Sequence, residues 1–84
     1  MNNKQTKTLQ AIFQRPRSGT IVFDDIEALI VGLGGEIQER TGSRVRIALQ
    51  DELWHCHRPH PEKEAKRYQI REAEEFLRRA GIRP

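Results

Sequence analysis

The feature that most constrains the fold is a short alternating run in the middle of the chain. Residues 44–49 read Arg-Val-Arg-Ile-Ala-Leu, so every second side chain is aliphatic. Successive side chains of a β-strand point to opposite faces, and the run therefore predicts a strand with one buried face and one face that carries Arg44 and Arg46. A chain of 84 residues, 36% of them hydrophobic, has room for one thin core around such a strand. This excludes the large enzyme folds.

Two further strand candidates flank this run, over residues 36–40 and 52–57. The segment Thr41-Gly42-Ser43 and the pair Gln50-Asp51 are typical of tight turns, and Pro59 lies just beyond the third strand. Short links of this kind join strands as antiparallel hairpins. We therefore predict a three-stranded antiparallel sheet.

Three segments show the apolar periodicity of helices: residues 4–14, 24–33 and 69–80. With the strands, the order is α, α, β, β, β, α, which predicts an α+β fold whose helices cover one face of the sheet. We expect residues 1–20 to form a helical arm with a linker at Arg17-Ser18-Gly19, and residues 21–84 to form the domain.

The helix ends also have sequence signals. Asp24 is a predicted N-cap, and Asp25 and Glu27 are predicted in the first turn, where the helix dipole favours acidic side chains. Gly34-Gly35 and Gly81 are expected to end the second and third helices, since glycine adopts the backbone conformation that commonly follows a helix.

The charge is concentrated in the second half of the chain. Residues 1–39 carry four basic and five acidic side chains, whereas residues 40–84 carry eleven basic and seven acidic ones. A basic surface suits a polyanion such as RNA, although a solvated surface explains the same charge. One cysteine, no apolar run long enough for a membrane span and no signal-peptide stretch predict a cytoplasmic protein that does not enter membranes.

The densest polar cluster is Trp54-His55-Cys56-His57-Arg58-Pro59-His60. Three histidines and a cysteine raise a zinc hypothesis, but Cys56 points away from His55 and His57 in a strand, and the chain has no other cysteine or histidine. We therefore predict no metal. The alternative is that Cys56 is a small core residue with Trp54 packed beside it.

Acid–base chemistry is a better use for these histidines. RNA cleavage needs a base, an acid and cations, and His57 and His60 lie beside Arg58. Basic side chains continue towards the last helix, where they could contact phosphates and Tyr68 could stack on a base. The alternatives are that the histidines are bystanders or contact phosphate without catalysis, and that the start of the helix is a solvated surface with Tyr68 partly in the core.

Several motifs occur in an order and spacing similar to those of a known family, over roughly 60 residues. The motifs are Gly34-Gly35, Thr41-Gly42-Ser43-Arg44, His57-Arg58-Pro59-His60-Pro61 and Phe76-Leu77-Arg78-Arg79-Ala80-Gly81-Ile82. With these motifs the chain resembles the HicA toxins, the mRNA interferase half of a type II toxin–antitoxin pair. The resemblance implies an αβββα domain similar to a double-stranded-RNA-binding domain, metal-independent cleavage of mRNA, and a HicB-like antitoxin as partner, with a homo- or hetero-oligomer as a further option.

One departure from the family pattern concerns catalysis. The resemblance implies a catalytic histidine after the glycine–serine turn, and this chain has Arg44 there. An arginine cannot act as a general base, because its pKa is too high for it to lose a proton. Three readings remain open. The histidine role has moved to His57 or His60, Arg44 stabilises transition-state charge, or the chain binds RNA or an antitoxin without cleaving.

The predicted function is accordingly a HicA-like endoribonuclease toxin without a cofactor. The alternatives are a non-catalytic RNA- or antitoxin-binding module on the same fold, and a pairing protein whose segment 4–14 docks a partner. The predicted catalytic residues are His57, His60 and Arg44. The predicted RNA-binding residues are Arg46, Arg58, Lys63, Lys66, Arg67 and Tyr68.

Overall fold

The fold is described from a computed structural model, which describes residues 1–17 and 19–84. Ser18 of the predicted linker lies outside these ranges. Each helix and strand lies within about two residues of its predicted position, and the two longer strands coincide with theirs. The elements are α1 (Asn3–Phe13), α2 (Phe23–Gly32), β1 (Glu36–Glu39), β2 (Arg44–Leu49), β3 (Glu52–His57) and α3 (Arg67–Arg79).

The strands form one antiparallel sheet in the order β1-β2-β3. The link between β2 and β3 is the pair Gln50-Asp51, and Gln50 has a φ of 56°, the positive value that the first central position of a type II′ hairpin turn requires. This two-residue turn pairs Leu49 with Glu52 and sets the register of the whole hairpin. Arg44 is consequently paired with His57, the last residue of β3.

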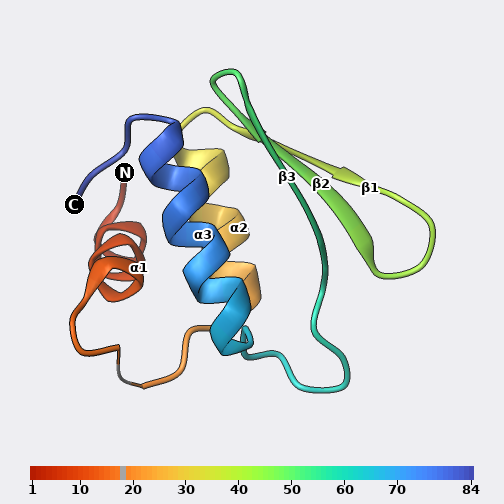
Figure 1. The fold of residues 1–84 in the computed structure, drawn as a ribbon, viewed down its shortest axis with the longest axis horizontal. Helices are drawn as coiled ribbons and strands as arrows, with labels where there is room; N and C mark the ends of the chain where they lie inside the picture. Colours follow the sequence, from red (N-terminus) through yellow and green to blue (C-terminus); the bar gives the residue numbers. More distant parts are fainter. Residues whose placement is uncertain (18) are drawn as a thin grey trace.

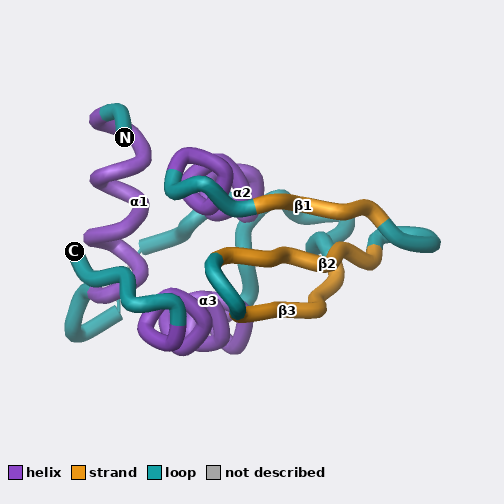
Figure 2. The backbone as a smooth tube through the Cα atoms, turned by 90° about the horizontal axis from the view of Figure 1, so that it is seen from above, coloured by secondary structure: helices purple, strands orange, loops and turns teal. Residues whose placement is uncertain are grey.

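The helices α2 and α3 lie together on one face of the sheet, and α1 packs on the side of these helices that faces away from the sheet (Figures 1 and 2). The predicted α+β class, with an αβββα arrangement preceded by an N-terminal helix, is confirmed. The core lies between the sheet and the α2–α3 pair. Its largest fully buried side chains include Phe23, Ile26, Leu29, Ile30, Ile47, Phe76 and Leu77.

The start of α2 differs from the prediction. The N-cap is Val22, which has no side-chain cap, and the predicted cap Asp24 lies inside the first turn with Asp25. Backbone pairing from a distant segment replaces the cap: the Phe23 N–H donates to the Lys63 carbonyl at 2.9 Å, and Val22 forms a β-bridge with Glu64. The prediction was wrong because these partners lie about 40 residues further along the chain. Glu27 also lies beyond the first turn.

The helix α3 begins at Arg67, two residues before the predicted start. The Lys66 N–H donates to Gln69 Oε1 at 2.9 Å, so a side chain three residues into the segment satisfies a backbone group at the helix start. At the other end the chain turns at Gly81, which has a positive φ of 81°, as predicted.

The arm α1 is part of the same core. Leu9 and Ile12 are 3% and 0% exposed and belong to the cluster that contains the α2 and α3 side chains. Gln5 Nε2 also donates to the Ala28 carbonyl of α2 at 3.1 Å. The sequence left open whether residues 1–20 pack on the domain, and α1 does.

Candidate functional site

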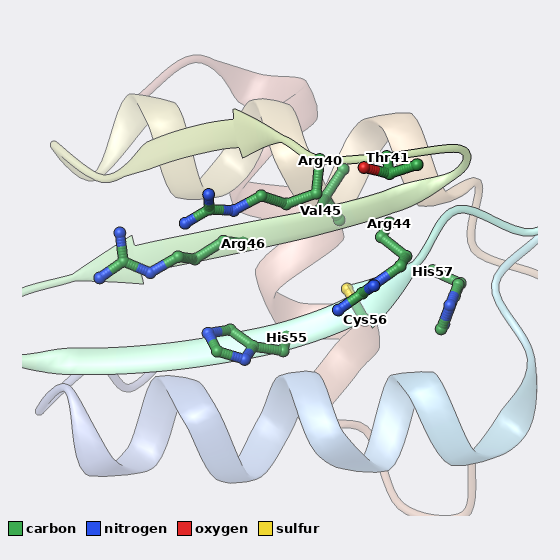
Figure 3. A pocket seen from close by; sticks show the side chains of 8 residues that line it. All are labelled: Arg40, Thr41, Arg44, Val45, Arg46, His55, Cys56 and His57. Atoms are coloured by element: carbon green, nitrogen blue, oxygen red, sulfur yellow. The ribbon is translucent and has the colours of Figure 1, made fainter.

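A hollow of about 390 Å³ lies on the face of the sheet that the helices leave uncovered (Figure 3). Its walls carry the guanidinium groups of three arginines and the imidazoles of two histidines, and Thr41, Val45 and Cys56 complete the lining. We refer to these five basic side chains as the outer face: Arg40, Arg44, Arg46, His55 and His57.

The strand pattern places these side chains together. Val45, Ile47 and Leu49 are buried against the helices, so their neighbours Arg44 and Arg46 point to solvent. In β3 the same alternation buries Trp54 and Cys56 and leaves His55 and His57 exposed.

Cross-strand pairing brings each histidine opposite an arginine. Arg44 pairs with His57, and Arg46 pairs with His55. Because the Arg58 N–H donates to the Ser43 carbonyl at 2.8 Å, the next pair, Arg44 and His57, is of the non-hydrogen-bonded type. Opposed side chains lie closest in pairs of this type, with Cα atoms about 4.5 Å apart. Each arginine of β2 is therefore a direct neighbour of one imidazole.

The three arginines of the outer face have no acidic partner among the described residues. None of the described residues that line the hollow is acidic, and the one interaction found for these five side chains runs from Arg46 to Gln38 Oε1, at 2.9 Å. Neighbouring like charges are unfavourable for folding unless an anion binds between them. A surface shaped only for stability would intersperse carboxylates.

The opposite side of β3 is structural. Trp54 packs against the rings of Phe23 and Phe76, and its Nε1 donates to Glu72 Oε1 at 3.0 Å. Burial, with the nearby charges of Glu27 and Glu72, raises the pKa of Cys56 to about 12, so the thiol stays protonated and is not a nucleophile. The sequence-based reading of Cys56 as a small core residue beside Trp54 is confirmed.

Arg58 lies next to His57 in sequence, but its side chain points elsewhere. Its guanidinium donates to both Glu27 carboxylate oxygens at 2.8 and 3.0 Å, and to Glu39 Oε1 at 2.8 Å. These hydrogen bonds raise the pKa of Arg58 above its ordinary value. Three of the five N–H donors of this guanidinium are thus already engaged by carboxylates of α2 and β1. The structure thus favours a structural role for Arg58 over the RNA contact expected from the sequence.

The other predicted residues lie outside the hollow. His60 is exposed in the loop after β3, and it does not line the hollow. Lys63 uses its backbone to pair with Phe23 and has an exposed side chain. Around the start of α3, Lys66, Arg67 and Tyr68 are exposed, and Arg67 borders a second hollow on the α1 side. Of the predicted set, the structure brings together Arg44, Arg46 and His57.

Two members of the outer face were not among the predicted site residues. His55 shares the exposed side of its strand with His57, and the two-residue turn at Gln50-Asp51 would have placed it opposite Arg46. Arg40 was assigned to the end of the first strand. Its N–H donates to the Arg44 carbonyl at 2.8 Å across the three-residue turn, which brings both arginines to the same end of the hairpin. The lengths of the two turns would have been enough to predict that His55 and Arg40 belong to the outer face.

The residues that the structure describes contain no cluster of three or more His, Cys, Asp or Glu side chains able to hold a metal ion. No described helix combines the length and the apolar character that a membrane span needs.

Comparison of the sequence with protein families gives a match over the part of the chain that forms the sheet, α2 and α3. A family profile described as the HicA toxin of bacterial toxin–antitoxin matches residues 23–82, from the first residue of α2 to just beyond α3. It includes the whole outer face and leaves out α1. No curated protein and no solved structure matches the chain. Because the profile covers well over half of the residues and the fold has the expected order of elements, the chain belongs to the HicA family of toxins of bacterial toxin–antitoxin systems.

Proposed function

We propose that this toxin is an endoribonuclease that binds mRNA on the outer face. Arg44 and His57 form the site at which a phosphodiester bond of the bound RNA is cleaved. The observation that carries the proposal is the direct pairing of Arg44 with His57 in a hollow whose described lining residues include no carboxylate. Where the family resemblance implies a histidine, this chain has Arg44. The neighbouring strand supplies an imidazole opposite that position, so the site retains the proton-transfer group that arginine cannot replace.

The reaction that fits these groups is attack by the RNA's own 2′-hydroxyl. One imidazole takes the 2′-hydroxyl proton as the 2′ oxygen bonds to phosphorus. The bond from phosphorus to the 5′ oxygen breaks, and a second side chain, acting as the acid, gives that oxygen a proton. The products are a 2′,3′-cyclic phosphate end and a 5′-hydroxyl end, and the electron pairs and protons balance without a metal or cofactor.

The outer face has groups for each role. His55 and His57 are two residues apart on one strand. At a rise of about 3.3 Å per residue, their Cα atoms are about 7 Å apart along the strand, which leaves space for a phosphate between the two imidazoles. Arg44 lies opposite His57, where its guanidinium can hold the extra negative charge of the transition state. Arg40 and Arg46 can position the flanking phosphates. His60 is the other candidate acid, contributed from the loop.

The test is cleavage of a defined mRNA by the purified chain in the presence of a metal chelator. We expect cyclic phosphate ends, and a rate reduced at least 100-fold by His57→Ala. Arg44→Lys is expected to lose most of the activity too, since a lysine lacks the planar fork of donors. Lys7→Ala, on the exposed side of α1, is the control and should cleave normally.

Other outcomes assign the chemistry differently. A loss with His60→Ala and none with His57→Ala would move the proton transfer to the loop. Salt-sensitive binding of RNA without any cleavage would overturn catalysis and favour the non-catalytic binding module.

The outer face is also a candidate binding surface for an antitoxin. We propose that a HicB-like antitoxin covers the outer face with acidic side chains, which would both exclude RNA and pair the uncompensated arginines. Growth arrest on induction in cytoplasm that lacks antitoxin, and its loss with His57→Ala, is the cellular test. Antitoxin binding unaffected by replacement of Arg40 and Arg46 would argue against this covering mode.

A further inference from the structure

We propose that Gln69 is a positioning residue that holds the backbone of His57 so that its imidazole stays opposite Arg44. The inference rests on the proposed function, because it gives a buried residue of α3 a part in that same site. Gln69 does not reach the hollow and acts only through His57.

The side-chain amide of Gln69 uses both of its ends. It is 1% exposed, its Oε1 accepts from the Lys66 N–H at 2.9 Å, and its Nε2 donates to the His57 carbonyl at 2.7 Å. Lys66 offers a backbone donor and His57 a backbone acceptor, so only one orientation of the amide satisfies both partners. Gln69 therefore joins the end of β3 to the start of α3 in one defined geometry.

The His57 carbonyl needs such a partner because of the sheet register. In a non-hydrogen-bonded pair, the backbone groups point away from the paired strand. Among the strands of the sheet, β3 lies at one edge, so the His57 carbonyl faces the open side of the sheet. His57 is also the last residue of β3, and the chain leaves the sheet directly after it. The Gln69 amide occupies the place that a fourth strand would fill.

Neighbouring contacts fix His57 from the other directions. Cys56 is buried in the core, and Arg58 is tied to Ser43 by its backbone and to Glu27 and Glu39 by its side chain. The residues on either side of His57 are thus anchored, and Gln69 anchors the carbonyl of His57 itself. For a catalytic group this matters, because a displacement of about 1 Å costs roughly 100-fold in rate.

The choice of glutamine also supports the proposal. Capping the helix start needs only the oxygen, and a glutamate would supply that oxygen while interacting more favourably with the helix dipole. Glutamine differs from glutamate in having a donor, and here the donor is used on His57. Helix capping by itself leaves this donor unexplained.

The deciding variant is Gln69→Glu, which keeps the acceptor for Lys66 and loses the donor to His57. We expect kcat for RNA cleavage to fall at least tenfold while KM stays within about twofold, because the arginines that bind RNA are untouched. The matched control is Glu72→Gln, one turn further along α3, which keeps the acceptor for the Trp54 indole. Its kcat should stay within about twofold of that of the unsubstituted chain.

Nuclear magnetic resonance separates this inference from the proposed function. In Gln69→Glu the signals of His57 and Arg44 should shift or broaden, whereas the Trp54 indole signal should not. This holds even if the chain proves unable to cleave RNA. In the unsubstituted chain, a scalar coupling between Gln69 Nε2 and the His57 carbonyl carbon is expected. If Gln69→Glu leaves kcat and the His57 signals unchanged, or if the coupling is absent, Gln69 is not a positioning residue.

Discussion

Two arginine-rich regions of this small protein differ in whether their arginines have acidic partners. On the outer face, Arg40, Arg44 and Arg46 have no acidic partner among the described residues. At the contact between α3 and the segment that follows α1, three arginines surround one carboxylate. We refer to this second group as the arm junction: Arg15, Arg17, Arg78 and Glu74.

The arm junction is built around a buried charge. The side chain of Glu74 is 4% exposed and accepts hydrogen bonds from Arg15 at 2.9 Å, Arg17 at 2.7 Å and Arg78 at 2.9 Å. Arg17 also donates to the Ile12 carbonyl at the end of α1, at 2.8 Å. Burial by itself would raise the pKa of Glu74, but the hydrogen bonds from these arginines outweigh it and lower the pKa to about 2.

The difference shows that an arginine's role depends on its partners more than on its position in a basic sequence. At the arm junction the guanidiniums are already satisfied by a carboxylate, and they hold the arm against the domain. On the outer face they remain available to an external anion. We expect substitutions at the two regions to separate stability from binding.

The largest effect is expected from Glu74→Ala. Removing the carboxylate leaves three guanidiniums close together without a partner, and the loss of one member of a buried ion pair costs about 3 to 5 kcal/mol. We expect about 3 kcal/mol here, because the arginine side chains reach solvent. Urea unfolding measures the change. Glu75→Ala, on the exposed side of the same helix, should change the free energy of unfolding by less than about 0.5 kcal/mol.

The next largest effect is expected from a substitution in the contact between α1 and the core. Ile12 is fully buried in the core, and Ile12→Ala is expected to lower the free energy of unfolding by at least about 2 kcal/mol through reduced burial and the cavity left behind. Gln10→Ala on the exposed side of α1 is the matched control. A cost below about 0.5 kcal/mol for Ile12→Ala would mean that the arm is not docked in solution.

The outer face should show the reverse behaviour. Replacing Arg40, Arg44 and Arg46 by alanine should weaken RNA binding and leave the unfolding midpoint unchanged or slightly higher, because neighbouring like charges are removed. The slope of log affinity against log salt should become shallower by about 0.7 for each single-strand phosphate that the variant no longer neutralises, or about 2 in all. Filter binding at several salt concentrations measures this slope. An unchanged slope would remove the outer face as the RNA site.

Of the two regions, the arm junction contains a carboxylate that acid pH can neutralise, and the outer face as defined contains none. The pKa of Glu74 is lowered from 4.5 to about 2 in the folded chain. Its stabilising contribution is therefore complete above about pH 4.5 and is lost as the pH falls towards 2. Unfolding curves over this range should lose stability more steeply for the unsubstituted chain than for Glu74→Ala. Equal slopes would show that Glu74 titrates alike in both states.

The smallest effect is expected at the start of α3. Combined replacement of Lys63, Lys66 and Arg67 removes exposed charges outside the hollow, so RNA affinity should fall less than with the outer-face variant, and alike for all RNA sequences. Parallel salt titrations of the two triple variants make the comparison. A larger loss at the helix start would transfer the main RNA contact to that segment.

Much of the fold could be predicted from neighbouring residues. The alternation in residues 44–49 specified β2 and its exposed arginines, and the apolar stripes specified the three helices. The turn at Gln50-Asp51 implied even the pairing of Arg44 with His57, because a two-residue turn leaves one register for the hairpin. These features are local, and the backbone geometry of strands and turns relates them directly to sequence.

The partners of the long charged side chains could not be predicted in this way. Arg58 looked like a phosphate ligand beside the histidines, yet it bridges Glu27 and Glu39. A glutamate in a helix is most often exposed, yet Glu74 is buried under Arg15 and Arg17. The sequence by itself thus determined the elements, their order and which strand face carries the basic groups. The tertiary structure decided which of those groups are free, because a flexible side chain pairs with whatever charge the packing of distant segments brings within its reach.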